Sequence, residues 1–234
     1  MLSIRNLQVC YGDFQVIWNV SMEVGAAEIV CMLGPNGAGK STVLNAVTGL
    51  ARPRAGSVHF AGKDLACVPT HDMVALGIAH VLERRRLFPT LTVRQNLMLG
   101  AHHKSLRAKR PRTLEWIESL FPKLAERRDQ LAGSMSGGEQ QLVAIARGLM
   151  GKPRLLMIDE PFLGLSPAAI DEILATVRAI NATGVAVLFN EQNVKLALSV
   201  SHRGYVIESG RIVLEGKGEE ILGHEMVRRV YLGL

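Results

Sequence analysis

The sequence contains few cysteines and no long apolar run. Three cysteines, Cys10, Cys31 and Cys67, occur among 234 residues, and their odd number and wide spacing argue against a disulfide framework or a metal-binding motif. We expect all three to be reduced, with Cys10 and Cys31 in apolar surroundings. No apolar stretch reaches the roughly 18 residues of a membrane span, and the N-terminal MLSIRNLQVC lacks the apolar region of a secretory signal. These absences predict a cytosolic chain that meets a membrane only by docking on a membrane protein.

Aromatic residues are also scarce, at 5% of the chain, and they are not interleaved with the basic clusters. The net charge is +6, and positive side chains gather at 84–86 and at 104–112. A solvated face is the plainest interpretation, with an acidic partner, anionic lipid headgroups or nucleic acid as alternatives. Nucleic acid is disfavoured because no stacking platform accompanies the charges.

Hydrophobic residues make up 48% of the chain, enough for one large domain or a core with an inserted lobe. Residues 1–60 predict strands at IRNLQVCYG, VIWNVSMEV, AEIVCML and GSVHFAG, and residues 91–150 predict mainly helices. RLLMID and VAVLF predict two more strands around a helix that Ser166 caps, and YVIESGRIVLEG predicts a hairpin turning at Ser209 and Gly210. Strands alternating with helices indicate an α/β fold with a mostly parallel sheet.

A phosphate-binding loop follows the buried-looking strand AEIVCML. GPNGAGKST matches G-x-x-x-x-G-K-[ST] and precedes a predicted helix, which is the confirming context. Backbone N–H groups would close around phosphate, Lys40 would reach the β- and γ-phosphates, and Ser41 would ligate Mg²⁺. The predicted nucleotide-binding residues of this loop are Gly34, Pro35, Asn36, Gly37, Ala38, Gly39, Lys40, Ser41 and Thr42.

The segment RLLMIDEP supplies carboxylates for the same chemistry. Its apolar run places Asp159 at the C-terminal end of a strand, where open α/β sheets bind ligands. We expect Asp159 to hold Mg²⁺ through water and Glu160 to polarise the attacking water. No N-K-x-D-like motif accompanies the loop, which disfavours a GTPase.

The segment MSGGEQQLVAIARGLM predicts a helix that starts with a capping box of Ser136 and Glu139. Its S-G-G-E-Q, lying between the phosphate loop and the D-E strand, resembles the signature of ABC-type ATPases. The resemblance implies that two cassettes sandwich ATP, and that the chain is active only as a dimer. The signature residues Ser136, Gly137, Gly138 and Glu139 would then face the γ-phosphate of ATP bound by the partner.

The resemblance assigns further positions. Tyr11 falls where the family stacks an aromatic ring on adenine. Glu83 replaces a glutamine that contacts Mg²⁺ or its water, and Gln192 replaces a histidine that contacts the γ-phosphate. His202 is out of register for that role and is expected at the surface or a helix end. The implied fold is a P-loop NTPase core with an N-terminal antiparallel β subdomain (1–83 and 151–234) and an inserted helical subdomain (84–150).

The segments ERRRLFPTLTVRQNL, DEPFLGLSP, EQNVKLAL and RGYVIESGRIVLEG resemble the LivF-type ATP-binding subunit of bacterial branched-chain amino-acid importers. The chain departs from that subgroup at 81–86, at Met135 and at Phe162. The resemblance implies a second cassette (a heterodimer, or else a homodimer), two permease subunits, a periplasmic binding protein acting indirectly, and no nucleic acid. It also implies a place at the cytoplasmic face of the inner membrane.

Three alternatives stay open. Importers of urea, amides or aromatic acids share the pattern. A non-transport ABC ATPase acting on nucleic acid or ribosomes is disfavoured by the single cassette and by the lack of heptads between Thr42 and Ser136. A binding-only cassette is disfavoured by Asp159 and Glu160, although Glu83 and Gln192 favour it slightly.

Overall fold

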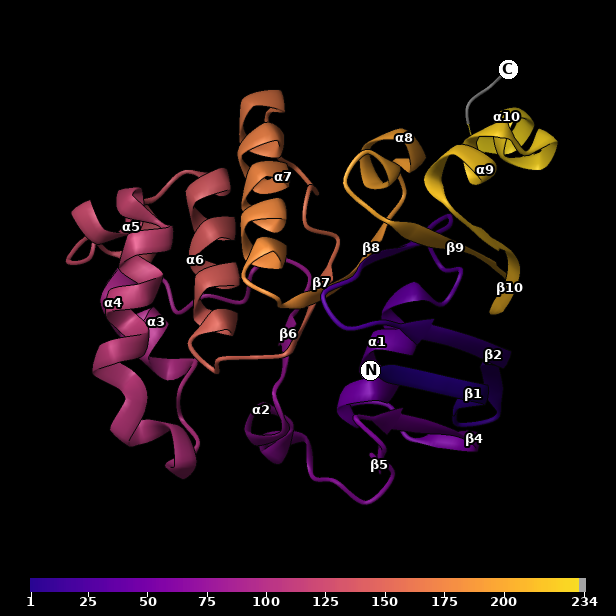
Figure 1. Ribbon diagram of the computed structural model, residues 1–234, viewed down its shortest axis with the longest axis horizontal. Helices are drawn as coiled ribbons and strands as arrows, with labels where there is room; N and C mark the ends of the chain where they lie inside the picture. The colour runs from indigo at the N-terminus through magenta and orange to yellow at the C-terminus, as the bar shows by residue number, and fades with distance from the viewer. Residues whose placement is uncertain (232–234) are drawn as a thin grey trace. The chain divides into compact units, whose positions relative to one another are not determined.

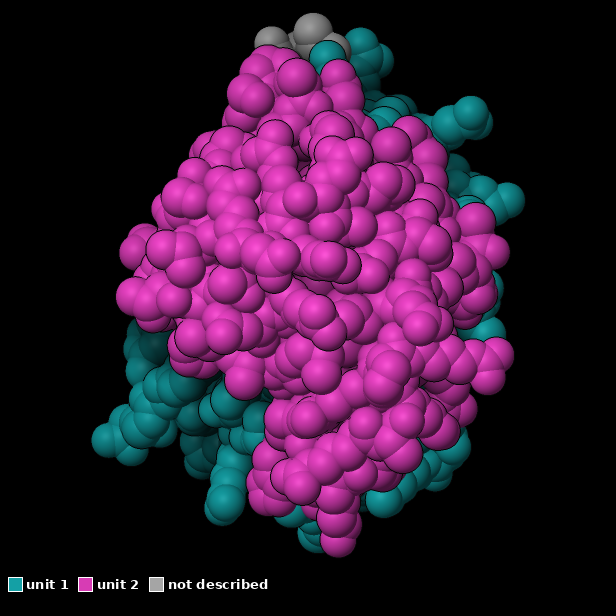
Figure 2. Space-filling view, turned by 90° about the vertical axis from the view of Figure 1, so that its left-hand side faces the viewer, with its two compact units in different colours: residues 1–70, 186–234 teal, residues 71–185 magenta. Residues whose placement is uncertain are grey.

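The computed structural model describes residues 1–231, which form two compact units. Unit 1 comprises Met1–Thr70 and the segment from Ala186 onward, and unit 2 comprises His71–Val185 (Figure 2). No helix within residues 1–231 combines the length and the apolar character that crossing a bilayer requires. The predicted boundaries of the helical subdomain, 84 and 150, stay a prediction.

Unit 1 begins with an antiparallel sheet in the order β2-β1-β4-β5 (Figure 1). Its strands are β1 (Leu2–Tyr11), β2 (Phe14–Val24), β4 (Pro53–Phe60) and β5 (Lys63–Asp64). Apolar side chains alternate along β1 and bury one face of the sheet. Asn6 breaks this alternation with a left-handed φ of 48°, and the pairing with both neighbouring strands shifts there, as at a β-bulge. The predicted N-terminal antiparallel sheet is therefore confirmed.

The second set of strands in unit 1 is mainly parallel. It contains β3 (Ile29–Leu33), β8 (Ala186–Glu191), β9 (Arg203–Glu208) and β10 (Arg211–Gly216). β3 pairs in parallel with both β8 and β9, and every residue of β3 is buried, as its continuous apolar run predicts. β9 and β10 form the predicted hairpin, in which Ser209 and Gly210 have left-handed φ values of 45° and 75°.

Polar residues extend β8 beyond the predicted run VAVLF. Asn190 and Glu191 belong to the strand, with exposed fractions of 0% and 7%. The extension follows from pairing with β3, because Leu33 is the register partner of Glu191. The helices of unit 1 are α1 (Lys40–Thr48), α8 (Val194–Leu198), α9 (Gly218–Gly223) and α10 (Glu225–Tyr231).

Unit 2 places helices around a parallel strand pair, and α3 to α7 stand side by side in Figure 1. The strands are β6 (Ile78–Val81) and β7 (Leu155–Asp159). The helices are α2 (Met73–Leu76), α3 (Val93–Leu99), α4 (Arg110–Leu120), α5 (Pro122–Glu126), α6 (Gly137–Leu149) and α7 (Pro167–Ala182), with 3-10 turns η1 (Thr70–Asp72), η2 (Lys104–Lys109) and η3 (Ala132–Ser134). Ser166 caps α7 with Pro167 at its first position, as predicted.

The buried amide of Asn96 fastens the segment before α3. Its Oδ1 accepts a hydrogen bond from the Phe88 N–H at 2.9 Å, and its Nδ2 donates to the carbonyl oxygens of Phe88, Leu91 and Thr92 at 3.0, 3.3 and 3.0 Å. The side chain is fully buried, so these bonds replace the water that it has lost. The segment 88–92 is therefore fixed to α3 by one polar residue.

Two expectations about single residues have mixed outcomes. Cys31 is buried, and burial raises the pKa of its thiol to about 12. The expectation of apolar surroundings is wrong for Cys10, which is half-buried and lies 3.7 Å from Nη1 of Arg54. Most cations of the 104–112 cluster are exposed, as the interpretation of a solvated face requires.

Candidate nucleotide site

The predicted phosphate loop connects β3 to α1 in unit 1. α1 begins at Lys40, and its N-cap is Gly39, which has a left-handed φ of 103° and provides no side-chain cap. A helix end without a side-chain cap presents N–H groups and a partial positive charge, which suit a phosphate. Gly37 also has a left-handed φ, of 79°. The loop therefore has the backbone geometry of an anion site.

Close approaches from neighbouring strands explain two of the glycines. A β-carbon on Gly34 would lie 2.2 Å from the carbonyl oxygen of Ile207, on β9. A β-carbon on Gly39 would lie 2.6 Å from Cδ1 of Ile17, on β2. The backbone oxygen excludes any β-carbon at position 34, whereas the Ile17 side chain can move, so glycine is favoured at position 39 mainly by its left-handed φ of 103°.

Lys40 lies over the inside of the loop. Its side chain is only 4% exposed, and Nζ donates to the carbonyl oxygens of Gly34 and Pro35 at 2.8 and 3.0 Å. A buried ammonium requires such acceptors, and phosphate oxygens are stronger ones. Ala38 and Thr42 are buried and Ser41 is half-buried, whereas Pro35, Asn36 and Gly37 are exposed at the loop tip.

Tyr11 ends β1 in the hairpin whose second strand packs on the loop. It pairs with Phe14 across the turn, and its side chain is 51% exposed. Ile17, three residues beyond Phe14, is the residue that contacts Gly39. An exposed ring on the hairpin that packs against a phosphate loop suits stacking on a base.

Gln192 follows β8 at the same edge of unit 1. Leu33 and Glu191 are register partners, so the phosphate loop and Gln192 leave neighbouring strands side by side. Glu191, which the sequence did not single out, accepts hydrogen bonds from the N–H groups of Gln192 and Asn193 at 2.9 and 3.3 Å. Its only signal in the sequence was a charge at the end of an apolar run.

His202 lies at the opposite end of β3. The ring Nδ1 of His202 accepts a hydrogen bond from the Ile29 N–H at 2.8 Å, and the backbone N–H of His202 donates to the Ile29 carbonyl oxygen at 2.9 Å. The residue is exposed, which confirms the prediction of a surface histidine. Among the strands of unit 1, the phosphate loop and Gln192 thus share one edge and His202 marks the other.

Asp159 and Glu160 end β7 in unit 2. Asp159 is the last strand residue and is 5% exposed, as predicted. Glu160 is half-buried and has a left-handed φ of 48°. A non-glycine residue in that region carries strain, which proteins retain mainly at functional sites.

Glu83 leaves the same edge of unit 2. Val81 and Ile158 are register partners, so Glu83 and Glu160 follow neighbouring strands, with Asp159 as the last residue of β7. The Glu83 side chain is 40% exposed and forms an ion pair with Nε of Arg84 at 3.3 Å. Residues 1–231 contain no group of three or more His, Cys, Asp or Glu that could hold a metal. A hydroxyl, one carboxylate, water and phosphate oxygens are nevertheless a ligand set that Mg²⁺ accepts.

The predicted capping box at the start of α6 is present. Ser136 Oγ accepts from the Glu139 N–H at 3.3 Å, and Glu139 Oε2 accepts from the Ser136 N–H at 2.9 Å. This hydrogen bond to Ser136 is the largest cause that lowers the pKa of Glu139, and Arg127 contacts the same carboxylate at 2.6 Å. A β-carbon on Gly138 would lie 2.7 Å from Cβ of Ala169, so that glycine lets α7 pack against α6.

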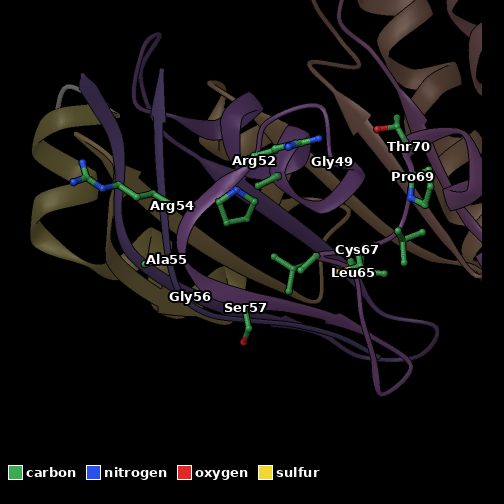
Figure 3. A pocket seen from close by; sticks show the side chains of 15 residues that line it. Gly49, Arg52, Arg54, Ala55, Gly56, Ser57, Leu65, Cys67, Pro69 and Thr70 are labelled. Carbon is green, nitrogen blue, oxygen red and sulfur yellow. The ribbon is translucent and has the colours of Figure 1, made fainter. Parts of the chain in front are cut away.

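Unit 1 also contains a hollow of about 550 Å³. It is lined by β4, by the end of α1 and by residues 65–70 (Figure 3). The side chains of Arg52 and Arg54 extend in different directions in Figure 3, so their charges do not converge. None of the predicted site residues lines the hollow.

Comparison with known proteins identifies the family. The sequence profile described as “ABC transporter” matches residues 17–163, more than half of the chain. This chain belongs to the ABC transporter family. The predicted family is therefore confirmed, and the chain is an ATP-binding subunit that couples ATP hydrolysis to transport.

Two relatives and two solved structures resemble this ABC ATPase over nearly its whole length. BraG of Pseudomonas aeruginosa, a high-affinity branched-chain amino acid transport ATP-binding protein, is 42% identical over 233 residues and 100% of both chains. LptB of Haemophilus influenzae, a lipopolysaccharide export system ATP-binding protein, is 36% identical, with 100% of this chain and 97% of LptB covered.

The structure of the ADP conformation of MJ1267, an ATP-binding cassette of an ABC transporter, has a TM-score of 0.87 at 28% identity, covering 100% of this chain and 99% of that one. The dimeric post-hydrolysis state of the cassette MJ0796, bound to ADP and Pi, has a TM-score of 0.76 at 27% identity, covering 93% and 98%. These matches confirm the predicted fold class, an ABC ATPase cassette. The relative BraG bears out the predicted resemblance to the branched-chain subgroup.

Proposed function

We propose that this ABC ATPase energises a bacterial importer of branched-chain or related amino acids. The observation that carries the substrate class is the 42% identity to BraG over the full length of both chains. LptB, which is named for lipopolysaccharide export, is less similar at 36%. Importers of urea, amides or aromatic acids remain the second candidate, because the subunit itself has no predicted contact with the transported molecule.

The proposed nucleotide site begins with the phosphate loop. The Lys40 ammonium turns from loop carbonyls to the β- and γ-phosphates, and the N–H groups at the start of α1 bind phosphate oxygens. Tyr11 stacks on adenine. These contacts bind ATP and hold its phosphate chain in one orientation, which is the main source of catalysis in phosphoryl transfer.

The ligand types of Ser41 and Asp159 fit Mg²⁺. Their oxygens would hold it, Asp159 through water, and bound Mg²⁺ would neutralise charge on the phosphates. Glu83 is a weaker candidate for the metal, because its carboxylate already pairs with Arg84.

Glu160 is the proposed general base. Its strained backbone fixes the carboxylate directly after the strand end, where it accepts a proton from the attacking water. Gln192 donates a hydrogen bond from its amide to the γ-phosphate. An amide has no cationic form at neutral pH, so Gln192 acts by hydrogen bonding alone, unlike a histidine.

A second cassette would complete each site. The capped start of α6, with Ser136, Gly137 and Gly138, binds the γ-phosphate of ATP held by the facing cassette. The dimeric cassette among the similar structures supports this arrangement. We expect a heterodimer, or else a homodimer, docked on two permeases at the cytoplasmic face of the inner membrane, with a periplasmic binding protein delivering the substrate.

Glu160→Gln tests the catalytic assignment. The variant should bind ATP normally and hydrolyse it at least about a hundredfold more slowly, the usual contribution of a general base. Glu115→Gln, an exposed carboxylate on α4, is the matched control and should keep full activity. Turnover at the wild-type rate in Glu160→Gln would contradict the assignment.

Lys40→Ala tests the phosphate loop by calorimetry. The variant should lose detectable ATP binding, whereas the exposed Lys63→Ala should bind as the wild type does. The substrate class is tested by radiolabelled uptake in a transporter assembled from this chain with its permeases and its binding protein. Leucine, isoleucine and valine should accumulate, and accumulation of urea or an aromatic acid instead would select the second candidate. Co-purification with ribosomes rather than permeases would contradict transport.

A further inference from the structure

Three consecutive arginines follow β6, and all three have a left-handed backbone. The φ values of Arg84, Arg85 and Arg86 are 60°, 63° and 46°, a conformation that costs energy for residues with a β-carbon. Arg147, in the last turn of α6, holds this turn in place. Its Nη2 and Nη1 donate to the carbonyl oxygens of Arg85 and Arg86 at 2.9 and 2.8 Å. The fold therefore fixes the direction in which the Arg85 side chain leaves the backbone.

That direction leads to the start of the signature helix. A β-carbon built on Gly137, the first residue of α6, would lie 3.2 Å from Nη2 of Arg85 and 3.7 Å from its Nη1. The guanidinium thus occupies the space that any larger residue at 137 would fill. Among residues 1–231, no carboxylate pairs with Arg85 and no hydrogen bond holds its side chain, whereas Arg84 beside it pairs with Glu83.

A guanidinium at this place is unfavourable in the isolated subunit. The N-terminus of a helix carries a partial positive charge and normally attracts acidic side chains. The acidic residue in the first turn, Glu139, is already engaged by the Ser136 N–H and by Arg127. The capping box therefore compensates part of the helix dipole, but the Arg85 guanidinium beside it has no anionic partner, and an arriving anion would supply one.

We infer that Arg85 is a phosphate-binding residue of the composite site, contacting the γ-phosphate of ATP held by the facing cassette. The inference rests on the proposed function, because it requires ATP to approach the start of α6 from a partner. Arg147 is the positioning residue that holds Arg85 in place. The guanidinium offers two parallel donors to phosphate oxygens, which lysine lacks.

The test is ATP-dependent dimerisation of the full chain carrying Glu160→Gln, alone and mixed with the second cassette, and analytical ultracentrifugation measures the dimer. Adding Arg85→Ala should raise the ATP concentration for half-dimerisation at least about tenfold, as expected for a lost charged hydrogen bond. Arg85→Lys should lie between the two. Arg84→Ala, on the same turn but ion-paired elsewhere, is the matched control and should dimerise like the parent. ATP affinity of the monomer and its melting temperature should be unchanged by Arg85→Ala.

The outcomes distinguish the role of Arg85 from the proposed function. Equal half-dimerisation concentrations for Arg85→Ala and Arg84→Ala would overturn the role of Arg85 and leave the proposed function intact. Failure of the Glu160→Gln parent to dimerise, both alone and with the second cassette, while it still binds ATP would overturn the composite site, and the role of Arg85 with it. A loss of monomer stability or of monomer ATP affinity in Arg85→Ala would show that Arg85 is structural.

Discussion

Replacing His80 by leucine should make the stability of the protein less dependent on pH. His80 lies on β6, and both of its ring nitrogens are buried without a hydrogen-bond partner among residues 1–231. Burial lowers the pKa of the imidazole from 6.5 to about 4, because the charged form loses its hydration. The folded protein therefore keeps His80 neutral at a pH where the unfolded chain protonates it.

The sign and the size of the effect follow from proton linkage. Between the two pKa values the unfolded state binds the extra proton, so the free energy of unfolding decreases as the pH falls through this window. His80 alone should lower it by about 2 kcal/mol between pH 7 and pH 5, and by about 3 kcal/mol at the limit below pH 4. In His80→Leu the unfolding free energy should no longer show this decrease between pH 7 and pH 4. Stability near pH 7 should also rise by about 1–3 kcal/mol, because a buried group without a partner is removed.

The measurement is urea unfolding between about pH 4.5 and pH 7.5. Each unit contains one tryptophan, Trp18 in unit 1 and Trp116 in unit 2, so fluorescence of single-tryptophan variants reports the units separately. His102→Leu, which removes an exposed histidine from unit 2, is the matched control. Parallel curves of unfolding free energy against pH for the wild type and His80→Leu would refute the reasoning.

Three further substitutions test features of the fold. Gly34→Ala forces a β-carbon to within 2.2 Å of the Ile207 carbonyl, so it should cost about 1–3 kcal/mol in urea unfolding and abolish ATP binding in calorimetry. Asn96→Ala removes four hydrogen bonds from a fully buried side chain and should cost about 2–4 kcal/mol in the same unfolding assay. Ser136→Ala removes the N-cap of α6 and should cost about 1 kcal/mol, while it also raises the ATP concentration needed for dimerisation.

Controls and contrary outcomes test these three predictions. Gly223→Ala, where a β-carbon meets nothing within 4 Å, is the control for Gly34 and should be neutral. Unchanged stability of Asn96→Ala would mean that water replaces the lost amide. For Ser136→Ala, a loss of stability without any effect on dimerisation would mean that Ser136 acts only as the N-cap of α6.

Local patterns predicted most of the fold and the centre of the candidate site. The sequence predicts the phosphate loop because strand, glycine loop and helix are contiguous, so its glycines and Lys40 appear in one short motif. Asp159 and the caps Ser136 and Ser166 were readable for the same reason, since an apolar run or a capping residue marks them within a few positions.

The features that the sequence concealed depend on residues far apart in the chain. Arg147 binds carbonyl groups of residues 85 and 86, and no local pattern predicts that contact. The need for glycine at 34 is set by Ile207 on β9. The apolar run predicts that β8 ends at Phe189, whereas its pairing with β3 continues to Glu191.

Glu191 bears on the position of Gln192, where the resemblance to ABC-type ATPases predicts a histidine. Its buried carboxylate accepts from the N–H groups of Gln192 and Asn193, so the backbone after β8 is held by residue 191. Asn193 then caps α8 by accepting from the Leu196 N–H at 3.1 Å. The backbone position of residue 192 is thereby set by its neighbours. In the proposed mechanism, glutamine at this position changes the proton chemistry near the γ-phosphate without moving the backbone, and Glu160 carries out the proton transfer.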